Sequence, residues 1–99
     1  MYTLRESKKK TKKYDLIKPD GKIMSFGAKH MSDYTIHHDK ARKERYIARH
    51  ETNEKKFWDD EVPLTPSYLS RFILWETKDI NKAILGVEHR RGIHINKEF

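Results

Sequence analysis

Two short apolar segments separated by a turn form the clearest pattern along the chain. Residues 14–17 read Tyr-Asp-Leu-Ile and residues 23–26 read Ile-Met-Ser-Phe, and both segments are typical of β-strands. Between them, Pro19 and Gly21 occupy the second and fourth positions of a Lys-Pro-Asp-Gly turn. This arrangement favours a type I turn followed by a left-handed glycine, as in a β-hairpin. Because a lone hairpin is marginally stable in water, we expect other elements to pack against it.

A second pattern predicts two apolar helices in the last third of the chain. Thr65 and Pro66 match the N-cap and the first position of a helix that is apolar around much of its girth and forms the centre of the predicted core. Asp79 matches the N-cap of another helix, with an apolar stripe at i, i+3, i+4 and i+7 and a stop signal at Gly92. The apolar residues of these helices are Tyr68, Leu69, Phe72, Ile73 and Trp75, then Ile80, Ala83, Ile84 and Val87.

A third, mostly polar helix is predicted to begin after Asp39 and to run from Lys40 to about His50. The residues around it, 27–38 and 51–64, are predicted to be loops, with Ser32–Thr35 setting the start of the helix against the hairpin. Residues 93–95 are predicted to form a closing strand that pairs with the hairpin. The pattern therefore predicts a single small α+β domain over residues 14–99, with an N-terminal β-hairpin, three short α-helices and a C-terminal strand.

Composition and charge add a basic segment before this domain. Hydrophobic residues make up 35% of the 99-residue chain and charged residues 37%, against typical values of roughly 45–50% and 25%. The net charge is +7, and most of it lies in residues 1–13. We predict that residues 1–13 form a flexible basic arm, which is either a solubilising tail or a contact for polyanions. Its basic residues are Arg5, Lys8, Lys9, Lys10, Lys12 and Lys13.

The polar helix carries a concentrated basic stripe. Arg42, Arg45, Tyr46 and Arg49 lie at i, i+3, i+4 and i+7, so they are predicted to share one helix face. Such a stripe suits a protein interface, because arginine and tyrosine are enriched at anchor positions. It also suits a nucleic-acid face, in which arginine contacts phosphate. The remaining interpretation is a solvated face paired with Asp39, Glu44 and the acidic residues 59–61 of the following loop.

The chain lacks the motifs of the common catalytic sites. It has no cysteine, no glycine-rich phosphate loop and no HExxH motif, and two of its six histidines are adjacent at His37-His38 rather than spaced for a metal. We therefore predict no enzyme activity, no metal and no cofactor, with a metal-dependent nuclease as the weaker alternative. No apolar run approaches the roughly 18 residues of a membrane span, and no signal peptide is predicted. The aromatic residues Phe57, Trp58, Trp75 and Phe99 are expected in the core or at its rim.

The sequence resembles a family of short uncharacterised proteins of large nucleocytoplasmic DNA viruses. The resemblance extends from about Lys12 to Glu88. Its motifs are Lys12-Lys13-Tyr14, Phe26-Gly27, Ser32-Asp33-Tyr34-Thr35, His38-Asp39, Arg42-Lys43, Arg45-Tyr46, Arg49-His50, Thr65-Pro66, Leu69-Ser70-Arg71 and Ile73-Leu74-Trp75. The resemblance implies a virion component, such as a minor capsid protein made in the host cell cytoplasm. It supplies no catalytic residues.

These observations together predict a structural protein that works by docking onto other virion or capsid proteins. The alternative is a nucleic-acid-binding accessory protein of a DNA virus, contacting nucleic acid through the basic arm. In both cases the predicted partner-binding residues are Arg42, Arg45, Tyr46 and Arg49 on the helix, and Lys8, Lys9, Lys10, Lys12 and Lys13 in the arm.

Overall fold

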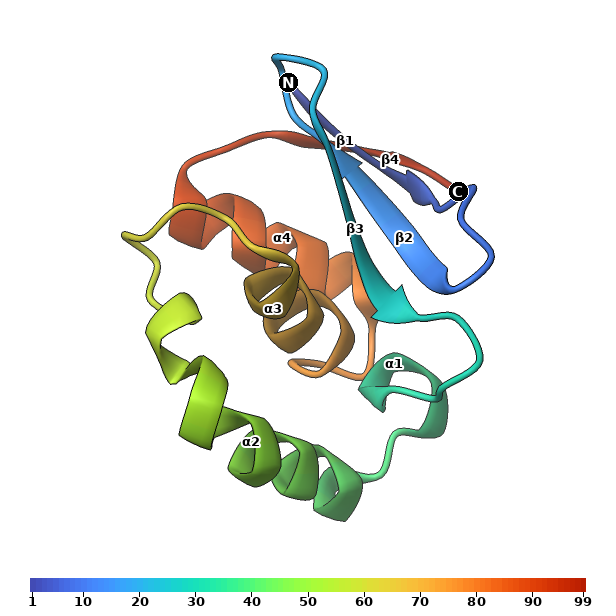
Figure 1. Ribbon diagram of the computed structural model, residues 1–99, viewed down its shortest axis with the longest axis vertical. Coiled ribbons are helices and arrows are strands. Elements are labelled where there is room, and N and C mark those ends of the chain that lie inside the picture. The colour runs from blue at the N-terminus through green and yellow to red at the C-terminus, as the bar shows by residue number, and fades with distance from the viewer.

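A mixed four-stranded sheet forms one layer of the protein in the computed structural model, which describes residues 1–99 (Figure 1). The strand order is β3-β2-β1-β4. Antiparallel pairing joins β1 to β2 and β2 to β3, whereas β1 and β4 are parallel. With the helices packed beside this sheet, the predicted α+β class is confirmed. The strands are β1 (Tyr2–Glu6), β2 (Lys12–Ile17), β3 (Ile23–Ala28) and β4 (Ile95–Glu98).

The prediction of a flexible arm over residues 1–13 is wrong. Tyr2–Glu6 form β1, an inner strand of the sheet, and Lys12 already belongs to β2. Leu4 of β1 is fully buried opposite Leu16 of β2. The basic composition of the segment does not indicate a strand. The stability of β1 comes from its two partner strands and one buried leucine rather than from local composition. The folded domain therefore begins at β1 and not at residue 14.

The hairpin of β2 and β3 is confirmed. Gly21 has φ +88°, its N–H donates to the Lys18 carbonyl at 2.9 Å, and the Lys18 N–H donates to the Lys22 carbonyl at 2.9 Å. These bonds describe the predicted turn with its left-handed glycine. The closing strand needs correction, because it covers Ile95–Glu98 and pairs in parallel with β1 rather than with the hairpin.

The predicted N-caps of the three longer helical segments are confirmed. Asp39 accepts from the Ala41 and Arg42 N–H groups, Thr65 from Tyr68 and Asp79 from Asn81. The helix after Asp39 is longer than predicted, and the predicted loop before it contains one further helical turn. The segments are α1 (Tyr34–His37), α2 (Lys40–Glu54), the 3₁₀ turn η1 (Lys55–Phe57), α3 (Pro66–Leu69), the π-helical turn η2 (Ser70–Leu74) and α4 (Ile80–Arg91).

The core lies between the sheet and the segment from α3 to α4. Each of the four strands contributes one buried residue to this core, and the other buried residues come from α3, η2 and α4. The ten buried residues are Leu4, Leu16, Phe26, Tyr68, Leu69, Ile73, Leu74, Ile84, Val87 and Ile95. None of these residues comes from α2, which runs along the outside of the molecule opposite the sheet (Figure 1). The helix with the predicted basic stripe is therefore peripheral to the core.

A polar row crosses three strands of the sheet. Arg5, Asp15 and Ser25 are direct cross-strand neighbours in β1, β2 and β3. The buried Asp15 carboxylate accepts from Ser25 Oγ at 2.6 Å and from the Arg5 guanidinium at 3.4 Å. Burial alone raises the pKa of Asp15, but the hydrogen bonds from Ser25, Ser7 and Arg5 outweigh it and hold the pKa below its ordinary value.

Candidate functional site

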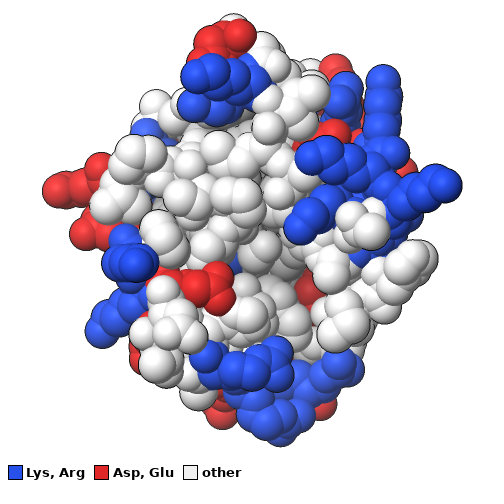
Figure 2. All heavy atoms as spheres, viewed as in Figure 1, with Lys and Arg blue, Asp and Glu red and all other residues white.

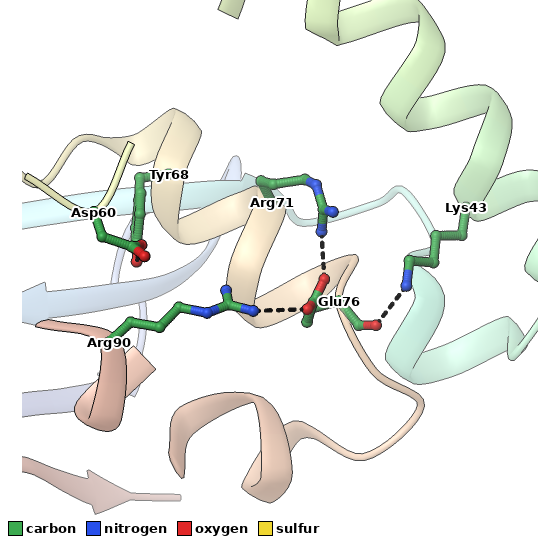
Figure 3. Close-up of polar contacts among 6 residues, drawn as sticks. All are labelled: Lys43, Asp60, Tyr68, Arg71, Glu76 and Arg90. Carbon is green, nitrogen blue, oxygen red and sulfur yellow. Dashed lines mark hydrogen bonds and ion pairs between the residues drawn. The ribbon is translucent and has the colours of Figure 1, made fainter. Parts of the chain in front are cut away.

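The helix α2 is fastened to the rest of the molecule by side chains that are mostly polar. Lys43, Tyr46, His50 and Glu54 follow one another at helical spacing and face the same side. At the start of the helix, Lys43 Nζ donates to the Glu76 carbonyl at 2.7 Å. Figure 3 shows Lys43 reaching from α2 towards Glu76, whose carboxylate accepts from Arg71 at 2.7 Å and Arg90 at 2.9 Å.

Tyr46 is a packing residue, so its prediction as a partner contact is wrong. Its side chain is buried, and its ring stacks on Trp75 with the centroids 4.2 Å apart and the planes 3° apart. The His50 ring lies 4.3 Å from the same tyrosine ring. Burial, together with the nearby Glu54 charge, raises the pKa of the Tyr46 hydroxyl to about 12. On the helix, Tyr46 lies at the edge of the arginine stripe, and this edge faces the rest of the protein rather than solvent.

A chain of hydrogen bonds fastens the other end of α2. Glu54 forms an ion pair with His50 and accepts from Ser67 Oγ at 2.7 Å, while Trp58 Nε1 donates to the same Oγ at 2.9 Å. Burial alone raises the pKa of Glu54, but the bonds from Ser67 and His50 outweigh it and lower the pKa. The carboxylate stands between the serine and the histidine, whereas a Ser-His-acid triad needs the histidine between the other two. This chain of groups is therefore best described as a structural link between α2 and α3.

A pocket of about 370 Å³ lies under α2, between this helix, the end of β3 and the start of α3. Its least exposed lining residues are Phe26, Leu74, Asp33 and Tyr46. Asp33 forms an ion pair with Lys13 of β2, whose side chain is only 10% exposed, and also accepts from Thr35. Because Lys13 is paired and nearly buried, its prediction as a partner contact is wrong. The pocket is further lined by Lys12, Gly27, Ala28, Met31, Ser32, Arg49, His50, Glu54, Pro66, Ser67, Ser70 and Trp75.

The remaining predicted contact residues are exposed and unpaired. Arg42 and Arg45 lie on the outer part of α2, Arg49 lies on α2 at the edge of the pocket, and Lys8, Lys9, Lys10 and Lys12 lie in and beside the β1–β2 turn. None of these seven side chains has an ion pair or hydrogen bond within the chain, so the predicted pairing with Asp39, Glu44 or residues 59–61 does not form. In Figure 2, basic side chains gather over the β1–β2 turn on the right and over the start of α2 at the bottom, with largely uncharged surface between them. We call these seven residues the basic surface.

The acidic loop contacts α4 rather than the basic helix. Arg91 of α4 donates to the carbonyls of Asp59, Asp60 and Val62, and its guanidinium lies over the Tyr68 ring at 5.0 Å. The Tyr68 hydroxyl donates to Asp60 at 2.6 Å (Figure 3). This loop is therefore part of the folded body. Of the aromatic residues predicted for the core or its rim, Trp75 packs against the core and Trp58 is half-buried, while Phe57 and Phe99 are 36% and 41% exposed.

Four of the six histidines, His37, His38, His50 and His94, make local polar contacts in this fold. The Asp39 N–H donates to His37 Nδ1 at 2.9 Å, and His94 pairs with Glu88 at 3.4 Å. No group of three or more His, Asp and Glu side chains lies close enough together to hold a metal ion. None of the helices is long and apolar enough to cross a membrane.

Sequence reasoning did not find the pocket. Its walls come from residues 12–13, 26–33, 46–54 and 66–75, which only the folded chain brings together. The one local signal was the spacing of Lys43, Tyr46, His50 and Glu54 on α2. Most of these side chains are polar, so a pattern of hydrophobic positions does not identify this face of α2 as an inner one.

Comparison with known proteins gives one match. The profile of a family of unknown function (DUF5754) matches residues 2–50. This segment runs from β1 to His50 of α2 and includes all seven residues of the basic surface. No curated protein and no solved structure matches the chain. The chain is therefore similar, over slightly less than half its length, to a family whose function is itself unknown.

Proposed function

We propose that this protein is a non-enzymatic docking protein whose basic surface binds an acidic surface of a partner protein. One observation carries the proposal: Lys12 of β2 and Arg49 of α2 line the same pocket, although they are far apart in the sequence. One residue from each of the two basic groups that the sequence indicated separately therefore borders a single pocket, while the other five residues of the basic surface do not line it. Because the residues of the basic surface form no ion pairs within the chain, their charge is available to a partner. Exposed cations also lose little solvation when they approach an anionic surface.

The aromatic residues beside the pocket favour a protein partner over nucleic acid. Sequence-tolerant binding of single strands relies on aromatic rings with a face open to the bases. Here Trp75 has Tyr46 stacked at 4.2 Å and His37 at 5.3 Å, and Tyr46 also has His50 at 4.3 Å. These contacts occupy the rings that a base would need. The second candidate is a nucleic-acid-binding accessory protein, and the observation that favours it is the exposed positive charge of the four lysines around the β1–β2 turn, which suits contacts to phosphate.

The virion setting remains a prediction from the sequence resemblance. If it holds, the acidic partner is another virion or capsid protein. Co-purification of the protein with particles, followed by cross-linking from lysines of the β1–β2 turn, tests this setting independently of the binding chemistry.

Binding to defined polyanions tests the docking proposal. The probes are fluorescent poly-glutamate and a 20-nucleotide single strand, each titrated at several salt concentrations. In one variant Arg42, Arg45 and Arg49 are all replaced by alanine. In the control variant, Lys22, Lys78 and Lys82 are replaced, which removes the same charge from exposed residues outside the basic surface.

We expect the arginine variant to weaken poly-glutamate binding at least about tenfold more than the control variant, since three specific contacts are lost rather than net charge alone. Equal weakening in both variants would refute a defined basic surface. Much tighter binding of the single strand, with affinity falling log-linearly in salt and depending on Lys8, Lys9, Lys10 and Lys12, would instead establish the nucleic-acid alternative.

A further inference from the structure

The pocket beneath α2 combines an apolar floor with a basic rim. Phe26, Leu74 and Tyr46 are 1%, 2% and 8% exposed and form its deepest part together with Asp33. Lys12 and Arg49 on the rim are exposed. A volume of about 370 Å³ lies at the low end of the range of roughly 300–1,000 Å³ for sites that hold small ligands or side chains.

The charged groups that line the pocket leave a net attraction for anions. Asp33 is neutralised by Lys13, and Glu54 is engaged by both His50 and Ser67. Lys12 and Arg49 have no such partner within the chain. A ligand that enters the pocket therefore meets unpaired positive charge at the mouth and apolar surface at the floor.

Two serines add hydrogen-bonding capacity between floor and rim. Ser32 and Ser70 both line the pocket and are partly exposed. Their hydroxyls take no part in the hydrogen bonds of the chain, unlike the hydroxyl of Ser67, which is held by Trp58 and Glu54. Such hydroxyls can donate to, and accept from, the backbone of an extended peptide.

From this arrangement we infer that the pocket holds an apolar side chain, such as phenylalanine or leucine, from an acidic segment of the partner protein. The inference rests on the proposed docking function and specifies its anchor. The side chain packs on Phe26, Leu74 and Tyr46, while flanking carboxylates meet Lys12 and Arg49. This anchor supplies specificity, because the basic surface alone attracts any polyanion.

Two labelled seven-residue peptides test the inference. Both alternate aspartate and glutamate, and one has phenylalanine at its centre while the other has serine. Burial of the ring predicts that the phenylalanine peptide binds the wild-type protein about tenfold more tightly. In Ala28→Trp, a large side chain at the lining of the pocket removes this preference and leaves the affinity for the serine peptide unchanged.

Ile23→Trp is the matched control, because Ile23 is also an exposed residue of β3 but does not line the pocket. It keeps the tenfold preference. Intermolecular nuclear Overhauser effects between the peptide ring and the Leu74 methyl groups provide a second measurement that needs no variant. Equal affinity for the two peptides, a preference that survives Ala28→Trp, or the absence of contacts to Leu74 would each overturn the inference.

The two proposals fail in different ways in this experiment. Replacement of Arg42, Arg45 and Arg49 weakens the binding of both peptides by the same factor and leaves the ratio of their affinities unchanged. A tenfold ratio without any effect of the arginines would refute the basic surface and retain the pocket. A strong effect of the arginines with a ratio of one would retain the basic surface and refute the pocket.

Discussion

Tyr46 offers the sharpest test of how α2 is held. In Tyr46→Ala, the protein loses a buried ring that is 8% exposed and stacks on Trp75 at 4.2 Å. Truncation of a buried aromatic side chain costs about 3–5 kcal/mol, and the aromatic pair itself contributes about 0.5–1.5 kcal/mol. Because the ring also lines the pocket, where the surroundings can relax, we expect a value near the lower limit, about 3 kcal/mol.

Urea unfolding followed by tryptophan fluorescence measures this loss, since Trp75 is the partner of the removed ring. Tyr46→Phe is the control. The Tyr46 hydroxyl makes no hydrogen bond within the chain, so this substitution should change the free energy of unfolding by no more than about 0.5 kcal/mol. Amide hydrogen exchange should accelerate in α2 more than in β1 and β2, because α2 shares none of the ten core residues.

A different result would refute the reasoning. If Tyr46→Ala lost less than about 1 kcal/mol of stability and left exchange in α2 unchanged, Tyr46 would not fasten the helix. If the same variant then also lost affinity for poly-glutamate, the original prediction of Tyr46 as a contact residue would be restored.

Two further predictions concern pH and glycine. The pKa values of Asp15, Glu54 and Glu76 are below their ordinary values, Glu76 because hydrogen bonds from Arg71 and Arg90 outweigh the effect of burial. Near pH 4.5 the unfolded chain therefore binds more protons than the folded chain, so the contribution of these carboxylates to stability is complete above about pH 5 and the urea midpoint should fall as the pH drops through the ordinary glutamate value of 4.5. Glu76→Gln should reduce this loss of stability in acid more than Glu44→Gln, which changes an exposed carboxylate without an ion pair. An equal effect of both substitutions would contradict the lowered pKa of Glu76. In Gly27→Ala, the added Cβ would lie 2.8 Å from Leu74 Cδ1 at a backbone φ of +77°, whereas in Gly92→Ala it meets open space at φ +62°. Thermal unfolding should show a loss of about 1 kcal/mol for Gly92→Ala and about 1–3 kcal/mol more for Gly27→Ala, and equal losses would argue against the close packing of β3 on η2.

The parts of the fold that the sequence predicted correctly depend on neighbouring residues. Gly21 specifies its turn through its own backbone, and Asp39, Thr65 and Asp79 cap helices that begin at the next residue. Such signals are complete within a few residues of the chain. They place the hairpin and the helix starts without knowledge of the tertiary structure.

The errors arose where a distant partner decides the outcome. β1 contains a single fully buried residue, Leu4, and becomes a strand because β2 and β4 lie on either side of it. Tyr46 and Lys13 were predicted to contact a partner, but in the fold Tyr46 stacks on Trp75 and Lys13 pairs with Asp33. The arginines of the stripe were predicted to be exposed, and they are, because nothing in the fold competes for them.

The parallel pairing of β1 with β4 has a consequence for the timing of folding. During synthesis β1 emerges first and the hairpin soon after, but the other edge of β1 stays open until residues 95–98 have left the ribosome. Pairing between segments so distant in sequence is slow, and an open strand edge can pair with other chains in the meantime. Release of the β4 segment, rather than completion of residues 2–50, therefore determines when β1 becomes an inner strand and the short, mostly exposed β4 replaces it as the edge of the sheet.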